Sequence, residues 1–340
     1  MTRIPAKPVL KYNQIVKIRA NPSNPRHPRS IPKGDLTMIA FVFTGGGSSG
    51  PLQAGAVRAL LESNIIPDMV VGTSAGALNA VFLAAHGPTL DAYDRLAQAW
   101  TGATKRKAMP GGYLGAFRRL IFRADSLFES SGLRTMLETE LPPAVRTFGD
   151  LKIPCYITAS DLRSRRLFLF GEEPGGPLIE AALASSAIPG VYPPIDYHGL
   201  QLVDGGVVDN VPASVAMDKG ATTLYLINVG YGGQTEDAVK GVIPIVDRAI
   251  GVFLAESLYA DLNRADLDPT IDLHHIQFPD FADVGLLDFD QTAAMLTAGY
   301  RITLDYLKDP HPRNQIQPLK SMDRPDAPIP GIREIPRRRP

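Results

Sequence analysis

The chain has 340 residues, of which 44% are apolar and 21% are charged. This composition is ordinary for a globular protein and excludes a collagen, a coiled-coil rod and a wholly disordered chain. The only cysteine, Cys155, excludes an intramolecular disulfide and a cysteine-rich zinc site.

The net charge of zero conceals basic ends on an acidic body. Residues 1–35 carry eight Lys or Arg and one acid, residues 309–340 carry seven and four, and residues 36–308 keep 20 basic and 30 acidic side chains. Both ends are also rich in proline and have no helix or strand periodicity. We therefore predict an N-terminal arm over 1–35, a folded body over 36–308 and a C-terminal tail over 309–340.

The sequence has no run of 18 apolar residues, and prolines interrupt the basic N-terminal stretch where a signal peptide would be apolar. These features predict a cytoplasmic protein whose basic ends are solvated or touch an anionic membrane surface. Nucleic acid is not an expected partner, because the basic segments lack interleaved aromatic residues and the body is acidic.

The first half of the body alternates short apolar strands with helices. A β-rich stretch at Met38–Thr44 ends at glycines, and apolar residues with helical spacing follow over Pro51–Ser63. A short strand over Asp68–Gly72 then precedes an Ala-rich helix over Ala75–Ala85.

The second half continues the alternation. The expected strands are Pro154–Ala159, Arg165–Phe170, Tyr197–Val203 with a hairpin turn at His198-Gly199, Thr222–Val229 and Ile271–Phe278, and the expected helices are Leu178–Ala187, Val242–Leu267 and Gln291–Leu307. Such an order predicts an α/β fold with a mostly parallel central sheet and helices on both faces.

Three local motifs follow predicted strands. The first, GGGSSG at residues 45–50, opens a helix, where backbone amides and the helix N-terminus favour a phosphate or an oxyanion. The second, GTSAG at 72–76, is a G-x-S-x-G string between a strand and a helix, which is the setting of a nucleophile elbow with Ser74 at its apex. The third, DGG at 204–206, contains either a turn aspartate or a base for Ser74.

In this order the motifs resemble those of the patatin-like phospholipase family. The resemblance covers roughly residues 38–230 and extends over the body to about 308. Beyond the three motifs it includes ASSAIP at 184–189, YPP at 192–194 and NVP at 210–212.

The resemblance implies a three-layer α/β/α sandwich and a lipid acyl hydrolase with a Ser–Asp dyad. Ser74 would be the nucleophile and Asp204 the general base, first for Ser74 and then for water. The backbone amides of Gly45, Gly46 and Gly47 would bind the oxyanion of a lipid or phospholipid ester. This chemistry implies no metal and no cofactor. One departure concerns Ser49, where the family has Arg or Lys, so a fixed positive charge is missing beside the site.

Other interpretations of the same residues remain open. Ser74, Asp204 and His274 or His275 have the chain order of an α/β-hydrolase triad. The G-x-G-x-x-G spacing within 45–50 also fits a dinucleotide site, for which Asp68 would be the ribose-binding acid.

Two further alternatives keep the same scaffold. An acyl-Ser74 could pass its acyl group to a lipid alcohol rather than to water, and a non-catalytic lipid-binding protein would not need Ser74 at all. A dyad predicts a buried Asp204, without a salt bridge, within hydrogen-bond reach of Ser74. Apolar residues over 113–128 and at Val191-Tyr192 are candidates for an acyl-chain cleft or a lid, and core packing explains them equally well.

Overall fold

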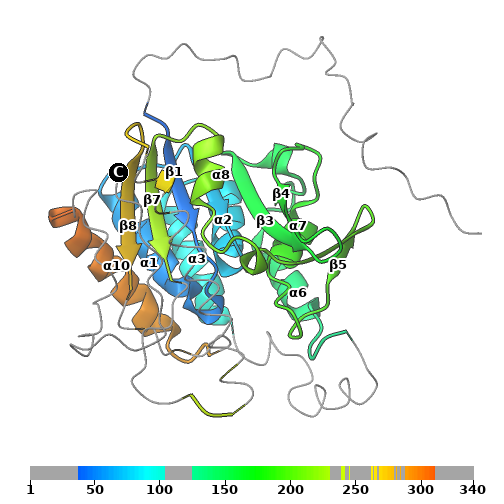
Figure 1. Cartoon of the computed structure of the whole chain (residues 1–340). Helices are drawn as coiled ribbons and strands as arrows, with labels where there is room; N and C mark the ends of the chain where they lie inside the picture. Colours follow the sequence, from blue (N-terminus) through cyan, green and yellow to red (C-terminus); the bar gives the residue numbers. More distant parts are fainter. Residues whose placement is uncertain are drawn as a thin grey trace, which may run out of the picture. The chain divides into compact units, whose positions relative to one another are not determined.

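The structure is a computed structural model of the whole chain (Figure 1). It describes residues 37–103, 125–229, 239–241, 268–278 and 288–310, together with positions 245, 262, 264, 265, 281 and 284. The predicted arm over 1–35 and the tail over 309–340, apart from residues 309 and 310, lie outside the described residues.

One eight-stranded sheet organises the described residues. Its main path runs β5-β6-β3-β2-β1-β7-β8, and β4 pairs with β3 off this path. Strands β3, β2, β1, β7 and β8 are parallel, whereas β4, β6 and β5 join by antiparallel pairings. The strands are β1 (Ile39–Phe43), β2 (Met69–Gly72), β3 (Cys155–Asp161), β4 (Arg166–Phe170), β5 (Ile195–Tyr197), β6 (Leu200–Asp204), β7 (Thr223–Asn228) and β8 (Asp272–Gln277).

Helices cover both faces of this sheet. Side chains of successive strand residues point to opposite faces, so each central strand contributes to two separate cores. In β1, Phe41 and Phe43 pack in a core with residues of α1, α2, α7 and α10, whereas Ala40 and Val42 pack in a core with residues of α8. The helices are α1 (Gly50–Glu62), α2 (Ala75–His86), α3 (Leu90–Gly102), α6 (Ser131–Glu140), α7 (Leu178–Ser185), α8 (Ala213–Asp218) and α10 (Thr292–Lys308), with 3-10 turns η2 (Gly47–Ser49), η3 (Phe148–Asp150) and η4 (Gly205–Val207).

The register places the ends of β2 and β6 together. Ile157 of β3 pairs with β2 and with β4, and Ala159 pairs with β6 and with β4. A strand has only two edges, so β2 and β6 must share the edge of β3 that β4 does not occupy. Since β2 runs parallel to β3 and β6 antiparallel, their carboxyl ends approach each other. The segments that follow Gly72 and include Asp204 therefore meet above this edge.

The predicted α/β class with a mostly parallel sheet is confirmed, and so are most of the predicted elements. Helices α3 and α6 were not predicted, because each buries only a few apolar side chains and reads as polar in sequence. Thr89 was a usable signal for α3, since its hydroxyl caps the helix by accepting the amide of Ala92 at 3.2 Å. The predicted helix over 242–267 lies outside the described residues except at four positions.

Helices α1 and α10 cross closely where both carry glycine. A Cβ atom on Gly299 would overlap the carbonyl oxygen of Leu52, and one on Gly55 would overlap that of Leu296. Backbone atoms cannot move aside as a flexible side chain can, so this crossing requires glycine.

We predict that Gly299→Ala lowers the free energy of unfolding by about 1–3 kcal/mol, the usual cost of overpacking. Helix propensity alone would raise it by about 1 kcal/mol. Urea unfolding measures the difference, with Gly175→Ala as the control, because an added Cβ there meets nothing within 4 Å. An increase in stability for Gly299→Ala would contradict the close crossing.

Candidate active site

Ser74 occupies a sharp turn between β2 and α2. Its backbone has φ 55° and ψ −123°, a conformation that L-residues rarely adopt and that persists only when the surroundings impose it. Cβ atoms on Gly72 and Gly76 would overlap the carbonyl oxygens of Gly76 and Phe43, respectively. The small residues that the G-x-S-x-G motif supplies are thus required by close backbone contacts.

Two serines of the 184–189 motif hold the backbone of this turn. The Ser74 amide donates to Ser185 Oγ at 2.9 Å, and Ser186 Oγ donates to the Ser74 carbonyl oxygen at 3.4 Å. Ser185 lies at the end of α7 and is fully buried. These contacts come from a helix distant in sequence, and they offset part of the cost of the strained conformation.

Asp204 ends β6 and faces Ser74. Ser74 Oγ donates to Asp204 Oδ2 at 2.6 Å, and the Gly206 amide donates to Asp204 Oδ1 at 2.8 Å. Both side chains are buried, and Asp204 has no salt-bridge partner among the described residues. Asp204 therefore fits both interpretations of the DGG motif, the turn aspartate and the base for Ser74. One carboxylate oxygen accepts from the amide of its own turn, and the other accepts from Ser74.

Burial sets the protonation behaviour of Asp204. Removal from water raises the pKa of this carboxyl to about 6, although the hydrogen bonds from Ser74 and Gly206 act to lower it. The carboxylate is thus a stronger base than an exposed aspartate, yet it remains ionised at neutral pH. This combination suits a group that must take a proton from a hydroxyl.

The glycine loop lies beside the serine. The Gly45 amide donates to the Asn210 carbonyl oxygen at 3.2 Å, so in this structure it is not free for an oxyanion. A Cβ on Gly45 would overlap Asn210 Oδ1 and approach Ser74 Cβ, so Gly45 leaves room for the nucleophile. Among the described residues, no acceptor faces the amides of Gly46 and Gly47, and Gly47 lines the pocket next to Ser74.

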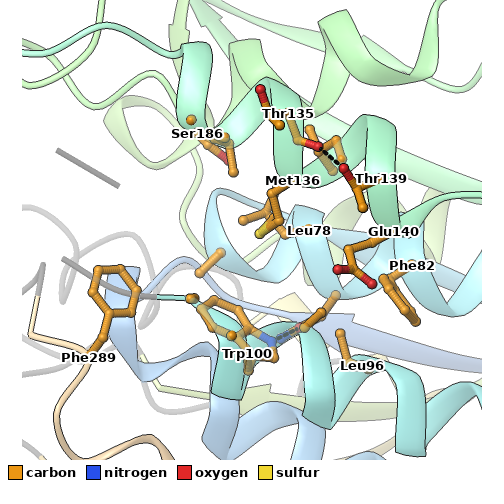
Figure 2. A pocket seen from close by; sticks show the side chains of 18 of the residues that line it. Leu78, Phe82, Leu96, Trp100, Thr135, Met136, Thr139, Glu140, Ser186 and Phe289 are labelled. Carbon is orange, nitrogen blue, oxygen red and sulfur yellow. Dashed lines mark hydrogen bonds between the residues drawn. The ribbon is translucent and has the colours of Figure 1, made fainter. Parts of the chain in front are cut away.

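An apolar pocket of about 510 Å³ opens next to Ser74. Figure 2 shows its side chains, which come mainly from α2, α3 and α6, the last two being the helices that sequence analysis missed. Tyr192, one of the predicted cleft residues, lines it; the predicted residues 113–122 lie outside the described residues. Its apolar lining includes Leu78, Phe82, Leu96, Trp100, Met136 and Phe289.

The histidines of the alternative triad do not join the site. Both are on β8, which is separated from β2 by β1 and β7, so about 14 Å of sheet intervenes. His274 contacts the Asp272 carboxylate and stacks on Tyr225, and His275 contacts the side chain of Asn228.

The acid expected for a dinucleotide site is also misplaced. Asp68 Oδ2 accepts the amide of Ile39 at 2.8 Å, at the amino ends of β2 and β1. The glycine loop follows the carboxyl end of β1, so Asp68 lies at the opposite end of the sheet from the ribose that it would bind. Ser49 is buried at the N-cap position of α1 and makes no side-chain capping hydrogen bond.

The described residues thus form an α/β fold in which Ser74 and Asp204 are paired beside an apolar pocket. A family model described as Patatin-like phospholipase matches residues 41–217. The chain therefore belongs to the patatin-like phospholipase family, which confirms the predicted family and supports the prediction of a lipid ester hydrolase.

Similar proteins carry related names. Patatin-like phospholipase domain-containing protein 7 of Rattus norvegicus is 30% identical over 60% of this chain and 15% of its own length. Lysophospholipase NTE1 of Mycosarcoma maydis is 28% identical over 60% of this chain and 10% of its own length. The chain thus spans only a small part of these relatives. Among solved structures, VipD from Legionella pneumophila has 17% identity and a TM-score of 0.47, covering 81% of this chain and 67% of its own.

Within the described ranges, no helix is both long and apolar enough to cross a membrane. In the same ranges, no group of three or more His, Cys, Asp or Glu is arranged to hold a metal ion. Contact of the basic ends with a membrane stays a prediction.

Because the Asp204 carboxyl is buried, we predict that the free energy of unfolding depends on pH. The pKa of Asp204 is about 6 in the folded chain and about 3.9 when unfolded. The folded state then binds the proton more tightly, so stability falls as pH rises from about 4 to 6. Asp204→Asn removes this loss, and its stability relative to wild type should increase by about 2–3 kcal/mol between pH 4 and pH 8.

Thermal unfolding at several pH values measures this difference. Asp161→Asn is a matched control from β3, because hydrogen bonds from Ser164, Gln201 and Arg163 outweigh burial and lower the pKa of Asp161. The stability of this variant relative to wild type should fall only as pH rises through the acidic range up to about 5, and it should be constant from there to pH 8. A pH-independent effect of Asp204→Asn would contradict the raised pKa.

Proposed function

We propose that the protein is a serine lipid acyl hydrolase that cleaves fatty acyl esters of lipids or phospholipids through an acyl-Ser74 intermediate. The observation that carries this proposal is the 2.6 Å hydrogen bond from Ser74 Oγ to the buried Asp204 carboxylate. Membership of the patatin-like phospholipase family supports the same chemistry.

In the acylation step, Ser74 Oγ attacks the ester carbonyl carbon while its proton moves to Asp204 Oδ2. The carbonyl oxygen becomes an oxyanion in the tetrahedral intermediate. Collapse of this intermediate breaks the ester bond, and the departing alcohol takes the proton from Asp204. Ser74 is then esterified and Asp204 is again a carboxylate.

In the deacylation step, water attacks the acyl-Ser74 carbonyl and gives a proton to Asp204. Collapse of the second tetrahedral intermediate releases the fatty acid and returns this proton to Ser74 Oγ. Asp204 thus serves as base and acid in each half of the reaction. An alcohol that replaced this water would turn the same steps into acyl transfer.

The oxyanion needs donors that are already in place. The amides of Gly46 and Gly47 are the donors that we assign to it, because neither has an acceptor among the described residues. The N-terminus of α2, which begins at Ala75, adds positive partial charge behind the nucleophile. Such preorganised dipoles are worth several kcal/mol in a site shielded from water.

The pocket supports an acyl chain as the part of the substrate that binds next to Ser74. It has a mainly apolar lining, and Ser74 and Gly47 belong to the same lining. An acyl chain in this pocket would carry its ester carbonyl to the nucleophile. Its volume of about 510 Å³ is within the range of small-molecule sites.

We predict that Ser74→Ala lowers kcat for a p-nitrophenyl acyl ester by about a thousandfold or more, and that Asp204→Asn lowers it by about 10²–10⁴-fold. With phospholipid substrates, Ser74→Ala and Asp204→Asn should show losses of similar size, measured as released fatty acid. Ser63→Ala, at an exposed serine that follows α1, is the control and should keep wild-type activity. Full activity of folded Ser74→Ala protein would overturn the proposal.

The pH dependence tests the base. Asp204 must be ionised to accept the Ser74 proton, so kcat/KM should rise about tenfold per pH unit below pH 6 and level off above it. The alternative triad would use His274 or His275, so the profile is measured in His274→Gln and in His275→Gln as well. The dyad predicts an unchanged profile in both variants. Loss of the acid limb in either variant would favour the triad.

A further inference from the structure

A chain of buried, uncharged hydrogen bonds runs behind the glycine loop. Trp100 Nε1 donates to Asn79 Oδ1 at 2.8 Å, and Asn79 Nδ2 donates to Gln53 Oε1 at 2.8 Å and to the Gly50 carbonyl oxygen at 3.0 Å. Asn79 and Gln53 are fully buried and Trp100 is nearly so. The three side chains come from α3, α2 and α1.

This hydrogen-bond network holds the glycine loop at both ends. Gln53 Nε2 donates to the Thr44 carbonyl oxygen at 2.8 Å and to the Ile227 carbonyl oxygen at 3.2 Å. Thr44 immediately precedes the loop over 45–50, and Gly50, its last residue, accepts from Asn79. Each contact uses a carbonyl of the main chain, so the position of the loop depends on the side-chain network.

Trp100 connects the network to the pocket. Its ring lines the apolar pocket, as Figure 2 shows, and its indole N–H donates to Asn79 of the network, which also belongs to the pocket lining. A Cβ on Gly50 would overlap the six-membered part of the ring, so the indole lies directly against the loop. One side chain therefore contacts both the acyl site and the backbone that carries the oxyanion donors.

The loop has a particular need for such support. Position 49 is serine, so no cation of the loop can fix it by charge, and Ser49 makes no capping hydrogen bond to α1. Oxyanion donors are effective only when they are already oriented, because reorientation during the reaction costs the stabilisation that they supply. A network of neutral hydrogen bonds provides this orientation without an unpaired buried charge.

We propose that Trp100 and Asn79 are positioning residues that hold the oxyanion loop, with the indole N–H of Trp100 as the contact on which the loop geometry depends. The inference rests on the proposed acyl hydrolase function and adds residues outside the dyad and the glycine loop. Loss of the indole N–H would leave Asn79 Oδ1 buried without its donor, and a buried unsatisfied acceptor drives rearrangement. The Asn79 amide would then shift, and the Gly50 carbonyl would follow it.

Trp100 is the only tryptophan in the chain, which permits an exact isosteric test. Biosynthetic replacement of tryptophan by β-(3-benzothienyl)alanine keeps the shape of the ring and exchanges only the N–H for sulfur. We expect kcat to fall by about tenfold with KM changed less than about twofold, the pattern of an interaction used in the transition state. The loss should be the same for acetyl and octanoyl p-nitrophenyl esters.

Phe82→Leu is the comparison variant, because Phe82 lines the same pocket but takes no part in the network. It should raise KM for the octanoyl ester more than for the acetyl ester. Trp100→Phe removes the N–H by ordinary mutagenesis and also shortens the pocket wall, so it should lower kcat for both esters and in addition raise KM for the octanoyl ester. Unfolding curves establish that each protein is folded.

Hydrogen exchange provides a readout that needs no activity. The amides of Gly45, Ser49 and Gly50 donate to the carbonyls of Asn210, Gly46 and Gly47, respectively. In the benzothienyl protein their exchange should be at least about tenfold faster, as local opening becomes easier.

The outcomes are distinguishable. Inactive wild type would overturn the proposed function, and unchanged exchange in the benzothienyl protein would overturn the loop-holding role whether or not the enzyme is active. Active wild type with an unchanged kcat in the folded benzothienyl protein would overturn the inference alone. If the benzothienyl protein instead showed an unchanged kcat and a KM that rose with the length of the acyl chain, Trp100 would be a pocket wall only. This result would also contradict the proposal.

Discussion

The site depends on one constraint of the sheet: β2 and β6 share a single edge of β3 and point their carboxyl ends at each other. A purely parallel sheet would place every carboxyl end on one line, each at its own strand position. Here the antiparallel return of β6 brings its last residue, Asp204, to the turn that follows β2. The 2.6 Å contact between Ser74 and Asp204 is a consequence of this pairing, although 130 residues separate the two in sequence.

The arrangement carries two energetic costs, and nearby residues offset both. Ser74 holds a strained backbone conformation, which the serines at the end of α7 and the flanking glycines stabilise. Asp204 is a buried carboxylate, and the loss of hydration raises its pKa. Two hydrogen bonds recover part of that loss and keep the group ionised near neutral pH. Strain and desolvation of this kind are typical of sites that prepare a nucleophile in advance.

Sequence analysis predicted the features that neighbouring residues form and missed those that distant segments form together. The turn at Ser74 and the strand before Asp204 have recognisable residues at fixed spacing, and the alternation of strands and helices predicted the sheet. Most of the pocket was not predicted, because two of its walls come from α3 and α6. Their few apolar residues, such as Tyr93, Leu96 and Trp100 of α3, do have helical spacing, but they lie in otherwise polar segments. The occupied amide of Gly45 was equally hidden, since its acceptor, the carbonyl of Asn210, lies 165 residues away along the chain. The network of Gln53, Asn79 and Trp100 joins three helices and leaves no motif.

We infer that Asp204 makes Ser74 a nucleophile. The most direct test is to treat the protein with a long-chain alkyl fluorophosphonate and to locate the adduct by peptide mass spectrometry. We expect one adduct, on Ser74, that forms at least about a hundredfold more slowly in Asp204→Asn. An adduct on another residue, or equal rates of Ser74 labelling in the two proteins, would contradict it.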